Sequence, residues 1–441
     1  MADSWVEIQP CSRPFQATVN VPGSKSITNR ALPIAAAAAG ESLLSGVLFA
    51  DDTRHMLNCL QKLGIHLDID ESARTVRVHG ANGNFSAPEA DLFCGNSGTT
   101  IRFLTALCAA TRGKYRLDGN ERMRQRPIDE LADAINSLGG RLQFPENTGF
   151  PPVQTIGAGL VGGRHRFTKS KSSQYISAVL MAAPMAKNPV EIVLEGPVTS
   201  EPYVRMTVAM MEQFGVAVQA SAASVTGPDD GRILRVAAGQ HYAGRPYAIE
   251  PDASNASYFL AAAALTPGAT AAIPGLGRNS LQGDVLFADV LAQMGAKLFL
   301  DADFVRITGP DKLRGLTIDM NTIPDMVQTL AVLALFAEGR THIVNVGNLR
   351  IKETDRLAAL QAELTSLGGQ VHTTADSITI DPPDKVQPAV IKTYDDHRMA
   401  MAFAVAGLRV AGIRIANPEC CAKTYPDFFK DFAIATVGKG A

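Results

Sequence analysis

A repeat of about 75 residues constrains this chain more than any other feature of its sequence. Six apolar, alanine-rich stretches recur along the 441 residues, each opened by small polar residues. They cover residues 24–40, 97–113, 172–188, 254–268, 323–339 and 394–412. Because each stretch would be apolar on nearly all sides of a helix, each is predicted to form a buried helix rather than a half-exposed one.

A second signature lies between these stretches: an amphipathic segment that ends in glycine and leads directly into an alternating strand. The glycines are Gly64, Gly139, Gly215, Gly295, Gly368 and Gly438. Glycine just after the last helical residue is a typical C-terminal cap. The repeat is therefore predicted to contain a buried helix, a strand, a surface helix and a strand. Such units would cluster around helical cores, and two domains of three units are the most economical packing.

Composition disfavours several classes of function. Lys and Arg total 41 against 43 Asp and Glu, and there is one Trp. This balance disfavours a nucleic-acid binder, which relies on a basic surface and often on aromatic stacking.

The six cysteines form no C-x-x-C pair and the histidines no H-E-x-x-H spacing, so no metal is expected. With no signal peptide and no apolar run of bilayer length, we expect a cytoplasmic protein with reduced thiols and no membrane partner.

Polar residues gather at the starts of the predicted buried helices. Helix N-termini present unpaired N–H groups and partial positive charge, so several converging termini would favour an anion. At the first start, PGSKSITNRAL carries Lys25, Ser26 and Arg30. It lacks the glycines of a phosphate-binding P-loop, which argues against a nucleoside triphosphate. A capping serine beside solvated basic side chains is the alternative.

The second and third starts offer further donors for an anion. CGNSGTTIRFL contains Asn96 and Gly98, and a glycine lets backbone amides approach a ligand closely. KSKSSQYISA contains Ser172, Ser173 and Gln174, whose hydroxyl and amide groups suit phosphate oxygens. A simple capping turn would explain either sequence as well.

Two other motifs need separate interpretation. Arg122, Arg124 and Arg126 lie close together, and their planar side chains suit carboxylate or phosphate binding, although such a loop can also be merely solvated. GAGLVGG at residues 157–163 formally satisfies the dinucleotide-binding pattern. No helix is predicted to follow it and no βαβ unit surrounds it, so we discard a dinucleotide site.

The later starts add acids to the cations. Asp252 opens the fourth stretch, and Asp325 lies beside Pro324 at the fifth, as at many ordinary helix starts. The loop that follows combines within nine residues Asn348, Arg350, Lys352, Glu353, Asp355 and Arg356. Such density suits holding a polyanion while moving protons, because neighbouring charges shift pKa values, although a salt-bridged surface has the same composition.

The sixth start carries Asp395, Asp396, His397 and Arg398, and Lys423 follows it. His397 is either a proton carrier or a histidine held by the neighbouring acids.

Eight motifs, taken in order, identify a family. They are PGSKSITNRAL, GNSGTTIRFL, RMRQRPIDEL, KSSQYISA, EPDASNASYF, RIKETDRLAAL, YDDHRMAMAF and KTYPDFF. In this pattern the chain resembles the 5-enolpyruvylshikimate-3-phosphate synthases, a family of enolpyruvyl transferases, along nearly its whole length. The resemblance implies an α/β (α+β) fold, a two-domain inside-out barrel-like arrangement with three repeated units per domain around buried parallel helices. The implied domains are residues 1–22 with 250–441 and residues 23–249, with the active site in the cleft between them.

The resemblance also implies a reaction. The enolpyruvyl group of phosphoenolpyruvate would pass to the 5-hydroxyl of shikimate 3-phosphate through a tetrahedral intermediate, with loss of phosphate, in the pathway to chorismate and the aromatic amino acids. Both substrates carry a phosphate and a carboxylate, which explains a concentration of cations in an overall anionic protein. The expected partners are these two molecules, without cofactor, metal, nucleic acid or membrane, and we expect a monomer.

Matching positions carry implied roles. Contacts to shikimate 3-phosphate are implied for Lys25, Ser26, Arg30, Ser172, Ser173, Gln174, Tyr203, Asp325, Asn348 and Lys352. Contacts to phosphoenolpyruvate are implied for Lys25, Asn96, Gly98, Arg126, Gln174, Arg356, Arg398 and Lys423. The implied catalytic groups are Asp325, Glu353, Lys25 and Lys423. Asp325 matches the base that takes the hydroxyl proton, and Glu353 and Lys25 match the candidates for protonating the methylene carbon.

Three positions depart from the common family pattern. Ser97 stands where alanine is usual, Phe103 where proline is frequent, and Leu349 where an aromatic is common. These departures bear on substrate affinity and on the response to glyphosate, the inhibitor of the family, and leave the implied reaction unchanged.

Two alternatives stay open from the sequence. A sister enzyme with the same fold transfers enolpyruvyl to UDP-N-acetylglucosamine, but it typically carries a cysteine in the arginine loop, and residues 120–130 contain none. A non-catalytic sensor of phosphorylated metabolites would need the cations but not the carboxylates Asp325 and Glu353.

Overall fold

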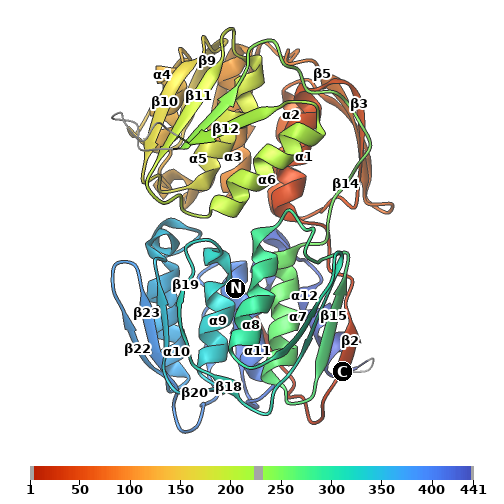
Figure 1. The fold of residues 1–441 in the computed structure, drawn as a ribbon, viewed down its shortest axis with the longest axis vertical. Coiled ribbons are helices and arrows are strands. Elements are labelled where there is room, and N and C mark those ends of the chain that lie inside the picture. The colour runs from red at the N-terminus through yellow and green to blue at the C-terminus, as the bar shows by residue number, and fades with distance from the viewer. Residues whose placement is uncertain (1–3, 223–231, 439–441) are drawn as a thin grey trace. The chain divides into compact units, whose positions relative to one another are not determined.

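The computed structural model describes residues 4–222 and 232–438 (Figure 1). The chain divides into two compact units by its contacts. Unit 1 comprises Met1–Pro22 and Glu250–Ala441, and unit 2 comprises Gly23–Ile249. Within the described ranges we find no helix whose length and apolar character would let it cross a membrane.

Six helices are buried along nearly their whole length, which confirms the prediction from the repeat. In unit 2 they are α1 (Lys25–Ala37), α3 (Gly98–Ala110) and α5 (Ser173–Ala182). In unit 1 they are α7 (Ala253–Leu265), α9 (Val327–Ala334) and α11 (His397–Gly407). Within each unit these helices lie inside and the sheets outside (Figure 1). Buried hydroxyls bond to carbonyls of their own helix, as Thr105 does with Ile101 at 2.6 Å.

Six amphipathic helices follow on the outside of the repeats. They are α2 (Asp51–Lys62), α4 (Asp129–Ser137), α6 (Glu201–Gln213), α8 (Phe287–Gln293), α10 (Arg356–Ser366) and α12 (Phe428–Thr436). Each ends near its predicted glycine, and these glycines have φ between +84° and +107°. This left-handed conformation is the one expected of a glycine C-cap, so the second signature is confirmed.

The described part of unit 2 contains three four-stranded sheets with one shared topology. The first runs in the order β14 (Tyr247–Ala248), β3 (Ala39–Ser45), β5 (Thr75–Ala81), β4 (His66–Asp70). The second runs β6 (Glu89–Phe93), β7 (Arg112–Asp118), β9 (Val153–Ala158), β8 (Leu142–Gln143). The third runs β10 (Gly163–Thr168), β11 (Val190–Glu195), β13 (Arg232–Val236), β12 (Val218–Ala222). In each, the first pair is parallel and the other pairs are antiparallel.

Unit 1 repeats this topology with one variation. Its first sheet runs β2 (Gln16–Thr18), β15 (Thr270–Pro274), β17 (Phe304–Thr308), β16 (Lys297–Leu300). Its second runs β19 (Thr317–Asp319), β21 (Thr341–Val344), β23 (Ile378–Asp381), β22 (Gln370–Thr373). Its third has the order β24 (Val390–Ile391), β25 (Arg414–Ala416), β1 (Trp5–Glu7), so the N-terminal strand replaces a hairpin. A short pair joins β18 (Leu313–Arg314) to β20 (Ala337–Glu338).

Two short strands do not pair with the strand that follows the next buried helix in the sequence. β2 precedes α1 in the sequence but pairs with β15 of unit 1, whereas β14 precedes α7 but pairs with β3 of unit 2. The chain therefore passes between the units twice. Backbone hydrogen bonds hold the segments at these crossings, because Asp252 N donates to Pro22 O and Ile249 N donates to Ser45 O, both at 2.8 Å.

Candidate functional site

The residues singled out in the sequence fall into two groups, one in each unit. The cationic cluster of unit 2 comprises Lys25, Ser26, Arg30, Asn96, Gly98, Arg126, Ser172, Ser173, Gln174 and Tyr203. The mixed cluster of unit 1 comprises Asp325, Asn348, Lys352, Glu353, Arg356, Arg398 and Lys423. Each group lies at the starts of the buried helices and in the loops and surface helices beside them.

Three serines cap the buried helices of unit 2. The side chains of Ser24, Ser97 and Ser172 accept hydrogen bonds from backbone N–H groups at 3.3, 3.4 and 3.2 Å. The capping interpretation is therefore correct for these serines. The residues that follow them, Lys25, Gly98 and Ser173, are the first residues of α1, α3 and α5.

Arg30 is a buried cation among neutral oxygens. Its Nε donates to Thr207 Oγ1 at 2.8 Å, and its Nη atoms donate to Ser26 O at 2.9 Å and Tyr203 O at 3.3 Å. Its guanidinium also lies 5.0 Å from the ring centroid of Phe103, a cation–π contact. Burial lowers the pKa of Arg30 to about 10, so the side chain stays charged at neutral pH. Among the described ion pairs it has no carboxylate partner, which leaves its charge available to an anion.

Gly98 lets two guanidinium groups approach the start of α3. A Cβ at this position would lie 2.5 Å from Arg102 Nη1 and 2.8 Å from Arg126 Nη2. The buried Arg126 donates from Nη1 to Asn96 O at 3.1 Å and to Asn96 Oδ1 at 3.2 Å. These are neutral acceptors, so Arg126, like Arg30, faces no carboxylate among the described residues.

The sequence reasoning missed Arg102 and Asp52. Arg102 donates to Gln174 Oε1 at 2.7 Å and so joins α3 to α5. Its position one helical turn after Gly98 could have revealed it, since residues i and i+4 share a helix face. Asp52, from the first turn of α2, lies with its Oδ2 3.6 Å from Lys25 Nζ.

The three clustered arginines have different surroundings. Arg124 pairs with Asp118 at 2.5 Å and with Glu146 at 3.3 Å, and Arg122 donates to Gln125 at 3.2 Å. Arg124 is thus part of a salt-bridged surface and Arg122 contacts a neutral side chain, whereas Arg126 joins the cationic cluster.

Asp325 is the centre of the mixed cluster. It lies in the 3₁₀ turn Pro324–Met326, and its Oδ2 is 2.9 Å from Arg398 Nη2. Its Oδ1 is 3.1 Å from Arg356 Nη1 and 3.5 Å from Lys352 Nζ. Burial by itself would raise the pKa of Asp325, but the three cations outweigh it and hold that pKa well below its usual range.

Arg356 holds three carboxylates with one guanidinium. Besides Asp325, its Nη2 lies 2.9 Å from Glu353 Oε2 and its Nε 2.7 Å from Asp396 Oδ2. Its side chain is 1% exposed, and although burial would lower its pKa, the carboxylates raise it. Glu353 Oε1 in turn lies 3.9 Å from Lys423 Nζ, so this acid stands between two cations.

Other predicted polar residues have structural contacts. Asp252 caps α7 by accepting from Asn255 N at 2.8 Å. Asp396 caps α11 by accepting from Arg398 N at 2.9 Å. Its Oδ1 lies 3.6 Å from His397 Nδ1, which is too long for a hydrogen bond, so both interpretations of His397 stay predictions.

Two further observations concern the loop before α10. Arg350 pairs with Asp355 at 2.9 Å and so holds that loop. The buried Oδ1 of Asn348 has no hydrogen-bond partner among the described residues, so it can accept from a ligand.

The discarded dinucleotide motif is not followed by a helix. Gly157 lies in β9, and strand β10 begins at Gly163. The geometry agrees with the rejection of a dinucleotide site.

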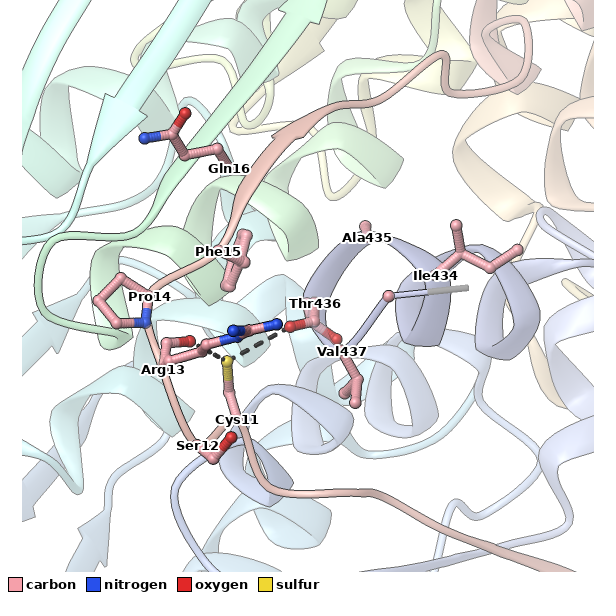
Figure 2. Close-up of a pocket in the computed structure, with 11 residues that line it drawn as sticks. Cys11, Ser12, Arg13, Pro14, Phe15, Gln16, Ile434, Ala435, Thr436 and Val437 are labelled. Atoms are coloured by element: carbon pink, nitrogen blue, oxygen red, sulfur yellow. Dashed lines mark hydrogen bonds between the residues drawn. The ribbon is translucent and has the colours of Figure 1, made fainter. Parts of the chain in front are cut away.

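A separate cavity of about 570 Å³ lies in unit 1 between residues 11–16 and the end of α12 (Figure 2). The Cys11 thiol beside it donates to Arg13 O at 2.8 Å and Thr436 O at 3.3 Å. None of the residues of the two clusters lines this cavity. It is therefore not the candidate site.

The fold of this chain is shared with two solved enzymes. NikO from Streptomyces tendae, a solved enolpyruvyl transferase, covers 98% of this chain and 97% of its own with a TM-score of 0.75 at 18% identity. A solved EPSP synthase from Acinetobacter baumannii covers 98% of both chains with a TM-score of 0.80 at 26% identity.

The sequence comparisons identify the family. The family described as EPSP synthase (3-phosphoshikimate 1-carboxyvinyltransferase) matches residues 11–432. A relative with that activity name from Nostoc sp. is 45% identical over 97% of this chain and 98% of its own. Another, from Laribacter hongkongensis, is 46% identical over 97% of this chain and 99% of its own. The chain belongs to the EPSP synthase family.

Arg356→Met should lower the free energy of unfolding by about 3–5 kcal/mol, because it leaves the buried carboxylate of Asp396 without its main cation. Arg340→Met is the matched control: its partner Asp381 lies at 2.8 Å, but the Arg340 side chain is 66% exposed, so we expect about 1 kcal/mol or less. Urea unfolding of both variants measures the difference. Equal losses would contradict the assigned role of Arg356.

Proposed function

We propose that the cationic and mixed clusters act on one pair of substrates, transferring the enolpyruvyl group of phosphoenolpyruvate to the 5-hydroxyl of shikimate 3-phosphate. The family and the relatives at 42–46% identity carry the corresponding activity name, an enzyme of the shikimate pathway. The observation that carries the proposal is the surroundings of Asp325, an ionised acid in contact with Lys352, Arg356 and Arg398. A base and the cations for an anion are thus present together.

Two cations of unit 2 are suited to substrate anions. Arg30 and Arg126 are buried, and their hydrogen-bond acceptors are neutral oxygens. Each can therefore bind a phosphate or carboxylate without first breaking an ion pair, which lowers the cost of binding. By family match, Arg30 with Ser26, Ser172, Ser173 and Tyr203 would hold shikimate 3-phosphate, and Arg126 with Asn96 and Gly98 would hold phosphoenolpyruvate.

The proposed reaction requires two proton transfers near C2 of phosphoenolpyruvate. One proton leaves the 5-hydroxyl whose oxygen bonds to C2, and the other reaches the methylene carbon next to C2. In the proposed addition, Asp325 takes the proton of the 5-hydroxyl as its oxygen bonds to C2, and the methylene carbon gains a proton from Glu353 or Lys25. In the elimination, that carbon loses a proton, the double bond re-forms and the C2–O bond to phosphate breaks. Lys423, Arg356 and Arg398 would stabilise the anionic charge of the intermediate and of the departing phosphate.

Substrate binding should also improve Asp325 as a base. Its pKa is held low by Arg398, Lys352 and Arg356, the same side chains that match substrate contacts. When substrate anions neutralise these cations, the carboxylate loses part of its stabilisation and its pKa rises. A higher pKa makes a stronger base while the group is still ionised near neutral pH.

The alternatives are weaker. The family match and the relatives favour shikimate 3-phosphate over UDP-N-acetylglucosamine as acceptor. A non-catalytic sensor would have no use for Asp325 and Glu353 beside the cations. We further propose that the protein is a cytoplasmic monomer. Its six cysteines are free, which suits a reducing compartment.

Phosphate release should require phosphoenolpyruvate and shikimate 3-phosphate together, because the phosphate leaves only after the acceptor oxygen has added to C2. A continuous phosphate assay with each substrate alone, with both, and with UDP-N-acetylglucosamine as acceptor tests this. Shikimate without its phosphate is the matched control and should be a poor acceptor. Release driven by UDP-N-acetylglucosamine would refute the proposed acceptor.

Asp325→Asn should lower kcat by about 10²–10⁴-fold, since the isosteric amide cannot accept the hydroxyl proton. Binding of shikimate 3-phosphate, measured by calorimetry, should persist. Asp319→Asn is the control, because Asp319 caps a turn by accepting from Asn321 N at 2.8 Å and should leave kcat unchanged. Near-normal turnover of Asp325→Asn would remove Asp325 as the base and leave the reaction standing.

The ionisation of Asp325 should shift on binding. Below its depressed pKa the carboxylate of the free protein is lost by protonation, and with shikimate 3-phosphate bound this loss should begin at higher pH. Carbon-13 NMR of labelled aspartate carboxyls, with the signal assigned by its absence in Asp325→Asn, follows this ionisation over the pH range in which the protein is folded. In the free protein the signal should stay that of the carboxylate, and in the complex it should begin to move as the pH falls. A signal that behaves alike in both would show that the substrate does not neutralise these cations.

A further inference from the structure

A group of histidines and carboxylates on the outer face of the first sheet of unit 2 has no part in the proposed reaction. It consists of Glu41 on β3, His66 and Asp68 on β4, and His79 on β5. We call it the histidine–carboxylate cluster. Among residues 4–222 and 232–438, this is the only place where three side chains that can bind a metal converge, namely those of His66, Asp68 and His79. None of its members belongs to the cationic or the mixed cluster.

The strand register brings these residues together. His66 lies opposite His79 across β4 and β5, and His79 lies opposite Glu41 across β5 and β3. Asp68 is two residues beyond His66 and therefore on the same face of its strand. Neighbouring positions such as Val78 point to the buried face. The cluster is thus a row of side chains across β3, β5 and β4, and it follows from the register in which these strands pair.

The ligand atoms are spaced as around one metal ion. Asp68 Oδ1 lies 3.2 Å from His66 Nε2, and Asp68 Oδ2 lies 2.9 Å from His79 Nε2. One ligand atom from each of the three residues lies within 4.8 Å of the others. Bonds of about 2.0–2.2 Å in a tetrahedral zinc site separate the ligand atoms by roughly 3.3–3.6 Å. Small displacements of these side chains would therefore bring all three ligands to one ion.

A second carboxylate, that of Glu41, contacts the less exposed histidine of this group, His79. His79 Nδ1 lies 3.1 Å from Glu41 Oε1, so Glu41 can accept a hydrogen bond from Nδ1–H. A metal ion at Nε2 would then replace the hydrogen bond between this nitrogen and Asp68. Metal-binding histidines commonly have such a carboxylate on the other ring nitrogen. The second oxygen of Glu41 is held by Arg77 Nη1 at 3.2 Å. Arg77, which lies opposite Asp68, also adds a positive charge to this face.

We propose that His66, Asp68 and His79 bind a divalent transition-metal ion of the zinc class, and that Glu41 orients His79. Two imidazoles and one carboxylate suit zinc, whereas magnesium and calcium prefer oxygen ligands alone. Three protein ligands leave one tetrahedral position for water or another ligand. His66 is 72% exposed, so the ion can enter without opening the sheet.

Titration of the chelator-treated full-length protein with zinc chloride, followed by calorimetry, tests the proposal. We expect one equivalent bound, with cobalt(II) giving the visible spectrum of a four-coordinate site. His66→Ala and His79→Ala should each abolish this binding. Glu41→Gln should weaken it about 10–100-fold, because it removes only the orienting carboxylate. His241→Ala, at an exposed histidine outside the cluster, is the matched control and should bind as the unmodified protein does.

Three results would overturn the proposal: no one-equivalent binding up to millimolar zinc, binding unchanged in both histidine variants, or an equal loss in His241→Ala. If a variant fails to fold, nitrogen-15 NMR of the unmodified protein decides instead. The ring nitrogen signals of His66 and His79 should both shift on adding zinc, and unshifted signals mean that the cluster is an ordinary surface ion-pair network. Because no cluster residue matches a substrate contact, failure here leaves the proposed transferase reaction unaffected.

Discussion

Six helices without a polar face can exist in water only if other parts of the chain cover them on every side. Each unit meets this demand with three small sheets and the amphipathic helices outside its buried ones. Because the sides of these helices are covered by other parts of the chain, the helix N-termini are the places where polar side chains can contact a ligand. The unpaired N–H groups and the positive end of the dipole also lie there. Lys25, Gly98, Ser173, Asp325 and Arg398 are found at or beside these starts for that reason.

The two clusters differ in whether their buried cations are paired with carboxylates. In unit 1, Arg356 contacts Asp325, Glu353 and Asp396. Because Lys352 and Arg398 also contact Asp325, and Lys423 lies near Glu353, the cations and acids largely balance before any substrate is present. In unit 2, Arg30 and Arg126 are buried among neutral acceptors and keep their charge for an anion. A buried cation without a carboxylate lowers stability but binds anions strongly, whereas a balanced network provides groups that can exchange protons. The proposed reaction needs both.

Much of the fold and the site could be predicted because the signals are local. Burial follows from composition around a helix, and the glycine C-caps follow from the need for positive φ. Local signals could not reveal the pairing of β2 with β15 and of β14 with β3, since these partners are distant in the sequence. Nor could they separate Arg126 from Arg124, because the distinction depends on Asp118 and Glu146.

The sequence by itself determined the sixfold repeat, the buried helices, the caps and the family, because periodicity and ordered motifs are properties of the chain alone. Only the tertiary structure decided which charges neutralise one another and which are left for ligands. The histidine–carboxylate cluster shows the difference. Sequence spacing predicted no metal site, since His66 and His79 form no ligand motif, yet strand register places them opposite each other. Side-chain proximity across strands is set by hydrogen-bonded pairing, which no local pattern encodes.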